Sequence, residues 1–331
     1  MRFFVLLGAV FAATAAWADA PKFDIPVSCV LGQECAIQQF FDHDPGPGYR
    51  DYACGSLAYD GHTGTDFRVP DLPAMRRGVA VVAAAPGRVR NTRDGMRDID
   101  VRDIDVADLA GRDAGNAVVI VHDDGWETQY SHLRLGSVAV ESGDNVVTGQ
   151  PLGDIGMSGN TAFPHLEFTV RHNGDAIDPF VGSGRHEGCG AGPNALWSDA
   201  ALAELKYVSS GILGAGFASA VPDWKRARDG SAFREKTLRT DAPVMTFWVS
   251  IYGTRSGDKT SLTLLAPDGA VVAQDVSPVE RNKAIWFVYI GRKYRAPGWA
   301  PGVYQGEFAL RRVVDGEETP ILKTVRKLAV R

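Results

Sequence analysis

Long apolar runs are absent from this sequence after its first 20 residues, which excludes a later membrane-spanning helix of ordinary length. An excess of basic residues is also absent: the formal net charge is −5, so the composition does not indicate a nucleic-acid-binding protein. No glycine-rich loop lies between a predicted strand and a predicted helix, which excludes a phosphate-binding loop of that kind. Cysteine is scarce, at four residues in 331, and this number favours two disulfides over a metal cluster.

The first 20 residues are typical of a secretory signal peptide. Arg2 gives a positive start, residues 3–16 are apolar, and the small residues Ala18 and Ala20 precede Pro21. Because the apolar run is too short for a stable membrane-spanning helix, we expect cleavage and no integral membrane segment afterwards. The mature protein is then periplasmic or secreted. A retained, uncleaved anchor is the less favoured alternative.

All four cysteines lie in the expected mature chain, where an exported protein forms disulfides. Four cysteines allow three pairings. We favour Cys29–Cys35, which closes a small loop, and Cys54–Cys189, which ties the start of the central region to its end. We expect both disulfides to be structural.

Roughly 310 residues follow the signal peptide, enough for two domains with separate cores. Turn formers dominate residues 21–55, which we interpret as an irregular lead-in held by disulfides. Within it, Asp42, His43 and Asp44 are interpreted as solvated turn residues, with cation binding as the less favoured alternative.

Short apolar runs separated by turns predict a mainly β fold with antiparallel sheets over residues 56–185. The predicted strands are residues 79–84, 87–91, 117–121, 127–133, 149–153 and 166–171. A glycine-rich stretch then begins a linker over residues 186–240, with a short helix at residues 199–206. Further strands at residues 244–250, 261–265, 284–289, 304–311 and 324–330 predict a small β-sandwich over residues 241–331. Its aromatic residues, among them Phe247, Trp248, Trp286 and Phe287, are expected in the core.

A charged insertion contains a tandem repeat, residues 97–101 and 102–106, each reading Arg-Asp-Ile-Asp-Val. The alternating polarity suits a strand with one wet face or a solvated loop. Repeated aspartates also suit calcium, but the spacing is not that of an EF-hand loop. We therefore favour a surface excursion that can flank a substrate groove.

Three separate segments carry residues suited to metal chemistry. His62 and Asp66 are four residues apart across Gly64, where a tight turn rather than a helix is expected. His132 ends a predicted strand. His165 and Glu167 are two residues apart on another strand, so both side chains face the same side, as a metal ligand and an acid/base partner would. Each histidine alone is more often a solvent-exposed or hydrogen-bonded residue, but three such segments together favour a site.

In this order, the three segments resemble the lysostaphin/LytM family of zinc endopeptidases, which cut peptide bonds in bacterial peptidoglycan. The resemblance covers roughly residues 50–182, including residues 143–150, 156–161 and Asp178-Pro179. It implies an antiparallel β-sheet catalytic domain. It also implies that His62 and Asp66 bind zinc, and that His132 and His165 are catalytic residues.

Glu167 stands where the family has its third zinc ligand, a histidine, and we expect Glu167 to fill that position because carboxylates also bind zinc. With two negatively charged carboxylates as ligands, we expect the zinc ion to lower the pKa of its bound water less strongly. The resemblance thus implies an exported endopeptidase acting on peptidoglycan peptides. The alternative is a non-catalytic LytM-domain protein that binds the cell wall and activates a cell-wall amidase.

Overall fold

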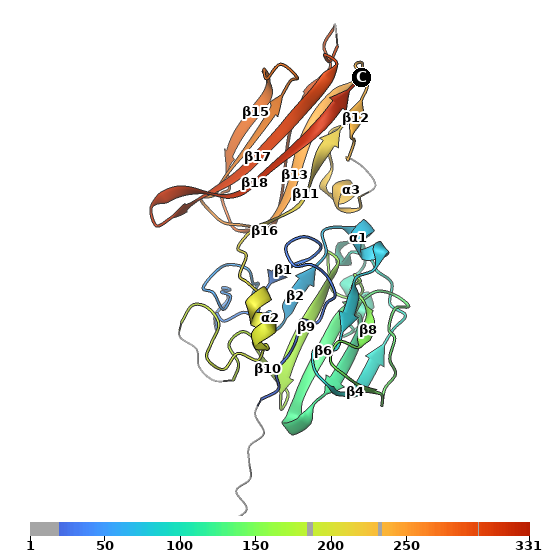
Figure 1. The fold of residues 1–331 in the computed structure, drawn as a ribbon. Helices are drawn as coiled ribbons and strands as arrows, with labels where there is room; N and C mark the ends of the chain where they lie inside the picture. Colours follow the sequence, from blue (N-terminus) through green and yellow to red (C-terminus); the bar gives the residue numbers. More distant parts are fainter. Residues whose placement is uncertain (1–19, 184–187, 231–233, 297) are drawn as a thin grey trace, which may run out of the picture.

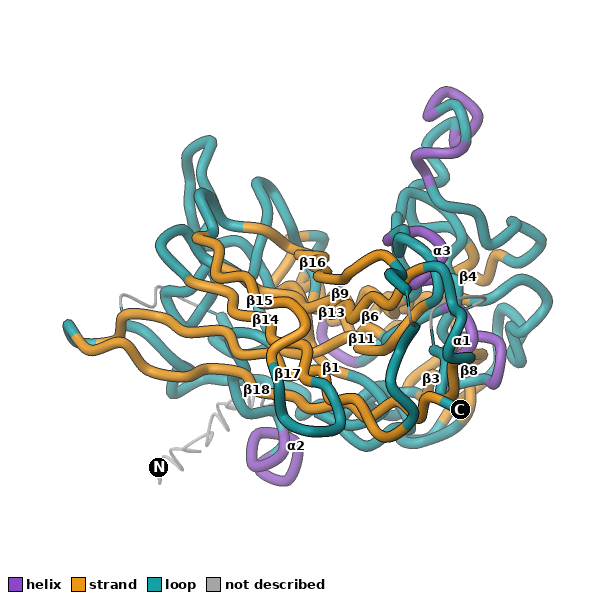
Figure 2. Tube along the Cα trace, turned by 90° about the horizontal axis from the view of Figure 1, so that it is seen from above, coloured by secondary structure: helices purple, strands orange, loops and turns teal. Residues whose placement is uncertain are grey.

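The computed structural model describes residues 20–183, 188–230, 234–296 and 298–331 (Figure 1). The expected signal peptide lies outside the described residues, apart from Ala20. Within the described residues, no helix is both long and apolar enough to cross a membrane. Strands and loops predominate in both views, with three short α-helices, so the prediction of a mainly β fold with antiparallel sheets is confirmed (Figure 2).

The larger sheet has the strand order β1-β2-β9-β6-β5-β4-β7, with β10 paired to β9, and all its pairs are antiparallel. Its strands are β1 (Ala36–Gln39), β2 (Thr65–Arg68), β4 (Gly87–Arg93), β5 (Asn116–Val121), β6 (Trp126–Leu133), β7 (Asn145–Val146), β9 (His165–His172) and β10 (Asp175–Ile177). A separate antiparallel pair joins β3 (Ala80–Val82) to β8 (Pro151–Asp154). The strands predicted in this region are confirmed, with shifted ends.

One hydrophobic core covers this sheet, and the lead-in belongs to it. Phe23, Val27 and Phe40 are buried in the same cluster as Phe168 and Trp197. Both favoured disulfides are present. Cys29–Cys35 closes the short loop, and Cys54–Cys189 brackets most of the sheet, with 135 residues of sequence separation.

The C-terminal strands form two sheets that enclose a second core, as expected for a β-sandwich. The three-stranded sheet contains β11 (Gly211–Ala218), β13 (Val244–Thr254) and β16 (Lys283–Lys293). The five-stranded sheet contains β12 (Thr237–Leu238), β14 (Lys259–Leu265), β15 (Val271–Pro278), β17 (Gly302–Val314) and β18 (Glu317–Val330), with β12 parallel to β18. Gly306 lets the sheets approach closely, since a Cβ there would lie 2.4 Å from the Phe247 ring.

The aromatic residues of the sandwich do not all lie in one core. Phe247 is fully buried in the core between the sheets. Trp248 and Phe287 instead pack together outside that core, with ring centroids 5.7 Å apart. Trp248 is thus buried as predicted, at 1% exposure, but in a separate small cluster with Phe287 packed against it, because alternate residues of β13 face away from the sandwich interior.

The α-helices within the described ranges are short: α1 (Leu72–Arg77), α2 (Asp199–Glu204) and α3 (Trp224–Arg228). The predicted helix at residues 199–206 is α2, which ends two residues earlier than expected. Helices α1 and α3 lie between the larger sheet and the sandwich (Figure 1).

Candidate metal centre

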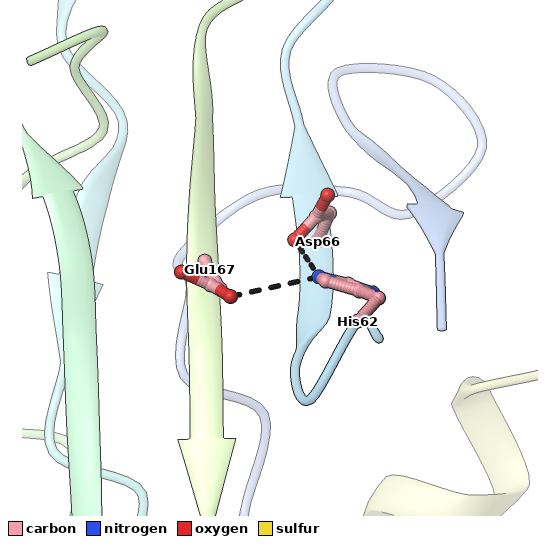
Figure 3. A group of neighbouring side chains, drawn as sticks. All are labelled: His62, Asp66 and Glu167. Atoms are coloured by element: carbon pink, nitrogen blue, oxygen red, sulfur yellow. Dashed lines mark hydrogen bonds and ion pairs between the residues drawn. The ribbon is translucent and has the colours of Figure 1, made fainter. Parts of the chain in front are cut away.

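Adjacent strands β2 and β9 bring three candidate ligands together (Figure 3). Asp66 on β2 is directly opposite Glu167 on β9, and His62 reaches them from the turn that enters β2. One ligand atom from each residue can be chosen so that all three lie within 4.8 Å of one another. His62 and Asp66 are 2% exposed, whereas the Glu167 side chain is 19% exposed, so the cluster is most accessible at Glu167.

Gly64 makes this approach possible. A Cβ at this position would lie 2.7 Å from Glu167 Cγ and 3.3 Å from the Phe168 carbonyl oxygen. Since real Cβ atoms do not come that close to a neighbour, any side chain here would displace Glu167. The glycine between His62 and Asp66 therefore has a steric role as well as forming the turn.

Three histidines have the same orientation at this centre. In each, Nδ1 donates a hydrogen bond to a backbone carbonyl, which can only accept, so Nε2 is the nitrogen left for chemistry. The acceptors are Phe40 for His62 (2.8 Å), Ser158 for His132 (2.8 Å) and Phe163 for His165 (3.0 Å).

The three Nε2 atoms all face the two carboxylates. His62 Nε2 lies 3.1 Å from an Asp66 oxygen and 3.6 Å from a Glu167 oxygen. His132 Nε2 lies 3.5 Å from the other Glu167 oxygen, and His165 Nε2 lies 3.6 Å from Asp66. The structure thus places all five predicted site residues in one cluster, and the His132 and His165 rings are 4.7 Å apart.

Electrostatics at this cluster favour a cation. Burial lowers the pKa of His62, but the carboxylates of Asp66 and Glu167 outweigh it and raise that pKa to about 10. Burial opposes ionisation of Glu167, yet hydrogen bonds from His132 and His62 hold its pKa well below its usual range. Burial lowers the pKa of His165 to about 4, so its imidazole is neutral at pH 7.

His132 has an uncommon backbone conformation, with φ of 63° at the end of β6. A non-glycine residue with positive φ is rare, and such strain concentrates at functional sites. The turn is held on both sides, because His132 N donates to the Ala114 carbonyl and its own carbonyl accepts from Gly156 N. This turn directs the ring toward Glu167.

The lead-in supports the centre through a buried aspartate. Asp42 is 9% exposed rather than solvated, and its carboxylate accepts hydrogen bonds from the backbone N–H groups of Asp44, Arg50 and Gly61. His43 also has a partner, since its Nε2 lies 2.7 Å from an Asp178 oxygen. The interpretation as a solvated turn residue is therefore wrong for Asp42. Its hydrogen bond from Gly61 N–H holds the residue that precedes His62.

The repeat insertion is neither a strand nor a free loop. It contains two short 3-10 turns, Val101–Asp103 and Val106–Leu109. The residues just before the first turn are hydrogen-bonded to the rest of the domain. Asp98 accepts from the N–H groups of Leu135 and Met157, at 3.1 and 2.7 Å. The alternation of polarity in the first copy reflects aspartates that bind backbone and arginine groups, not a wet strand face.

Asp100 is the most connected residue of the insertion. It is 3% exposed, and its carboxylate pairs with Arg102 at 2.6 Å and with Arg228 of α3 at 2.5 Å. Both guanidinium groups donate to the Ala162 carbonyl and lie over the Trp224 ring. Asp100 therefore joins the insertion, helix α3 and the segment that leads to His165.

A β-sheet with buried histidines and carboxylates converging between adjacent strands defines a candidate metallohydrolase. Residues 60–179 match the sequence profile described as Peptidase family M23. The chain therefore contains a peptidase family M23 domain, which confirms the family resemblance carried by the three segments.

The match to known proteins is confined to this part of the chain. A DD-carboxypeptidase/endopeptidase, Mpg, from Neisseria meningitidis serogroup B is 33% identical over 120 residues, which are 36% of this chain and 22% of that protein. This chain thus spans about a fifth of that relative's length.

Two solved structures are also similar. The catalytic domain of the M23 protein EnpA from Enterococcus faecalis is 24% identical, with a TM-score of 0.33, and the match covers 51% of this chain and all of that one. The catalytic domain of lysostaphin from Staphylococcus simulans is 27% identical, with a TM-score of 0.27, covering 36% and 76% of the two chains.

Several residues that contribute to the site were not predicted from the sequence. The carbonyl groups of Phe40, Ser158 and Phe163 carry no residue-type signal, because any residue has one. Thr161, whose Oγ1 lies 3.1 Å from His165 Nδ1, precedes His165 by four residues in a segment already noted for its family likeness. The Tyr59 ring is tilted against the His62 ring, with 4.4 Å between the ring centroids, and Tyr59 gave no sequence signal of its own.

Proposed function

We propose that this chain is an exported zinc-dependent endopeptidase that hydrolyses peptide bonds in peptidoglycan cross-links. The observation that carries the proposal is the convergence of His62, Asp66, His132, His165 and Glu167, from three separate segments, with every histidine Nε2 facing a carboxylate. The name of the Neisseria relative, a DD-carboxypeptidase/endopeptidase, supports a peptidase activity for the matched region.

The donor set fits zinc. His62, Asp66 and Glu167 offer one imidazole nitrogen and two carboxylate oxygens, which are ligands that zinc accepts. The raised pKa of His62 has the same cause, since the two carboxylates favour a positive charge between them. In the proposal these three residues hold the metal, and a bound zinc ion supplies Lewis acidity that makes a water molecule nucleophilic near neutral pH.

The two other histidines have separate roles in the proposal. His165 keeps Nδ1 protonated through Phe163, so its unprotonated Nε2 can accept a proton from the attacking water. His132 Nε2 lies 3.5 Å from a Glu167 oxygen, and it can donate a hydrogen bond when it carries a proton. As a donor it would stabilise the negative charge that develops on the scissile carbonyl oxygen.

We also propose the division of labour along the chain. Residues 56–185 carry the catalysis, and the β-sandwich, whose strands begin with β11 at Gly211 rather than at residue 241, positions substrate or a partner. The two disulfides support an oxidising location, periplasmic or extracellular.

Elemental analysis of the dialysed protein, beside His62→Ala, is the experiment that tests the proposal. We expect about one zinc per chain, lost in the variant, because a catalytic site needs its three protein ligands. Digestion of purified peptidoglycan by the native protein, but not by the variant, should accompany it. A folded protein that takes up no added zinc would refute the proposal and favour a non-catalytic protein that binds the wall and activates an amidase.

A further inference from the structure

A cavity of about 320 Å³ lies where the sandwich meets the M23 domain. Its walls come from β2, the repeat insertion, α3 and the face of the three-stranded sheet that points away from the sandwich core. Trp224, Trp248 and Phe287 give it a partly aromatic lining. The cavity therefore exists only because the two parts of the chain pack together.

Positive charge dominates this lining. Among the described residues that line the cavity none is acidic, whereas five are basic: Arg68, Arg102, Arg228, Arg234 and Lys283. Asp100 is shared between Arg102 and Arg228, and Asp71 pairs with Arg234. In a chain with a net charge of −5, this local excess of cations is an exception.

Two of these cations have no carboxylate partner within the described part of the chain. Arg68 is 2% exposed, and its guanidinium group donates to the Gln38 side chain and the Val69 carbonyl, both uncharged. Lys283 makes no ion pair there and lies 5.9 Å from the centre of the Trp286 ring. A buried guanidinium without a counter-charge is costly, and an anion in the cavity would reduce that cost.

The cavity is close to the candidate metal centre. Arg68 and Asp66 are two residues apart on β2 and so point to the same side of the sheet. The Phe163 ring bridges the two places, since it stacks on His165 at 4.5 Å and lies 4.8 Å from the Arg68 guanidinium. One aromatic side chain thus separates His165 from the basic cavity.

The positive surface continues beyond this cavity. A neighbouring hollow of about 600 Å³ shares Pro70, Leu213, Gly214 and Arg234 with it. Its further basic residues are Arg77, Lys236, Arg326 and Lys327, against two acidic ones, Asp71 and Glu235. An extended ligand with more than one negative charge would match this arrangement better than a single small anion.

We propose that the junction cavity is an anion subsite of the enzyme, which binds a carboxylate of the peptide substrate beside the scissile bond. The inference rests on the proposed function, because it takes the occupant to be the peptide that is cut. Guanidinium and ammonium groups bind carboxylates through charge-assisted hydrogen bonds, and the aromatic walls pack against the apolar parts of the peptide. The sandwich then completes the substrate-binding surface.

Binding should be measured by calorimetry on the full chain carrying His62→Ala, without zinc, so that no turnover occurs. The probes are a synthetic peptidoglycan stem tetrapeptide with free carboxylates, the same peptide with amidated carboxylates, and short-chain polyphosphate. Lys283→Met removes one lining cation. Lys293→Met is the matched control, since Lys293 is exposed on the same strand β16 and lies outside the cavity lining.

The free-carboxylate peptide should bind about tenfold more weakly to Lys283→Met, as expected for one hydrogen bond to a charged group. Lys293→Met should bind like the parent, and amidation should weaken binding by a similar factor. Equal affinity for the free and amidated peptides, or for Lys283→Met and its control, would overturn the subsite. Lys283-dependent binding of polyphosphate without peptide binding would overturn the peptide as occupant.

These results are independent of the hydrolytic test. Zinc-dependent peptidoglycan digestion with no Lys283 effect on peptide binding would leave the proposed function and remove the subsite. If the peptide binds specifically but the native protein neither holds zinc nor digests peptidoglycan, the enzymatic role would be removed and a binding site would remain.

Discussion

Replacement of Asp100 by asparagine should destabilise the protein, because Asp100 is the buried charge that holds the repeat insertion to helix α3. The Asp100 side chain is 2% exposed, and the side chain of its partner Arg228 is 11% exposed. The side chain of its other partner, Arg102, is 47% exposed. The exposed pair contributes little. Loss of one partner of a buried pair costs about 3 kcal/mol or more, so we expect a loss of about 3 kcal/mol in the free energy of unfolding.

This loss can be measured by urea unfolding of Asp100→Asn beside a control variant, Asp105→Asn, in the second copy of the repeat. Asp105 is the counterpart of Asp100 in the second copy and is exposed, and within the described residues its carboxylate accepts a hydrogen bond from Ala107 N–H alone. Asp105→Asn should therefore change stability by no more than about 0.5 kcal/mol. In thermal melts, the Asp100 variant should unfold about 6–12 °C lower.

The dependence on pH has a definite sign. Burial opposes ionisation of Asp100, but hydrogen bonds from Arg102 and Arg228 hold its pKa far below the usual range. Its stabilising contribution is complete above the unfolded pKa of about 3.9 and is lost as the pH falls further. The stability difference between the native protein and Asp100→Asn should therefore shrink below about pH 4.

The pairwise origin of the effect can be isolated. In a double-mutant cycle with Arg228→Met, the two changes together should cost less than the sum of the single changes. Additive losses, or an Asp100→Asn variant as stable as Asp105→Asn, would refute the account of Asp100 as a buried link.

Three other predictions concern the centre and the disulfides. Gly64→Ala should weaken zinc binding about tenfold or more by displacing Glu167, as perturbed supports of metal ligands do; unchanged affinity in a zinc titration would contradict this. Glu167→His should keep zinc and raise the hydrolysis rate, since a neutral ligand leaves the metal more acidifying; the account of this position fails if affinity and rate both stay the same. Removal of the Cys54–Cys189 bond by double alanine substitution should cost about 5 kcal/mol, against about 2 kcal/mol for the short-loop disulfide of the lead-in, because it closes the longer loop; equal losses in urea unfolding would argue against the loop-length explanation.

Most strands of both parts could be predicted, because apolar runs bounded by turn residues carry their own signal. Strand β11 could not, since its glycines interrupt the pattern. Gly211 and Gly214 leave room for the rings of Tyr252 and Trp248, where a Cβ would lie 2.2 and 3.1 Å away. The reason for those glycines lies on a neighbouring strand, which a local reading of the sequence does not see.

The residues of the candidate centre were found because their types and order match a known family. Their supports were not, because the support depends on tertiary position. Asp42 and Asp100 look like ordinary loop aspartates in the sequence, yet both are buried and each binds several partners. The identity of a side chain shows that it can accept hydrogen bonds, but only the fold shows how many donors reach it.

The long-loop disulfide also determines how tension would pass through the molecule. The Cα atoms of Cys54 and Cys189 are 5.3 Å apart, and every residue of the candidate centre lies in the loop between them. A pulling force applied to the chain before Cys54 and after Cys189 would travel through the covalent bond and bypass that loop. A single backbone cut inside the loop would therefore not separate the two ends.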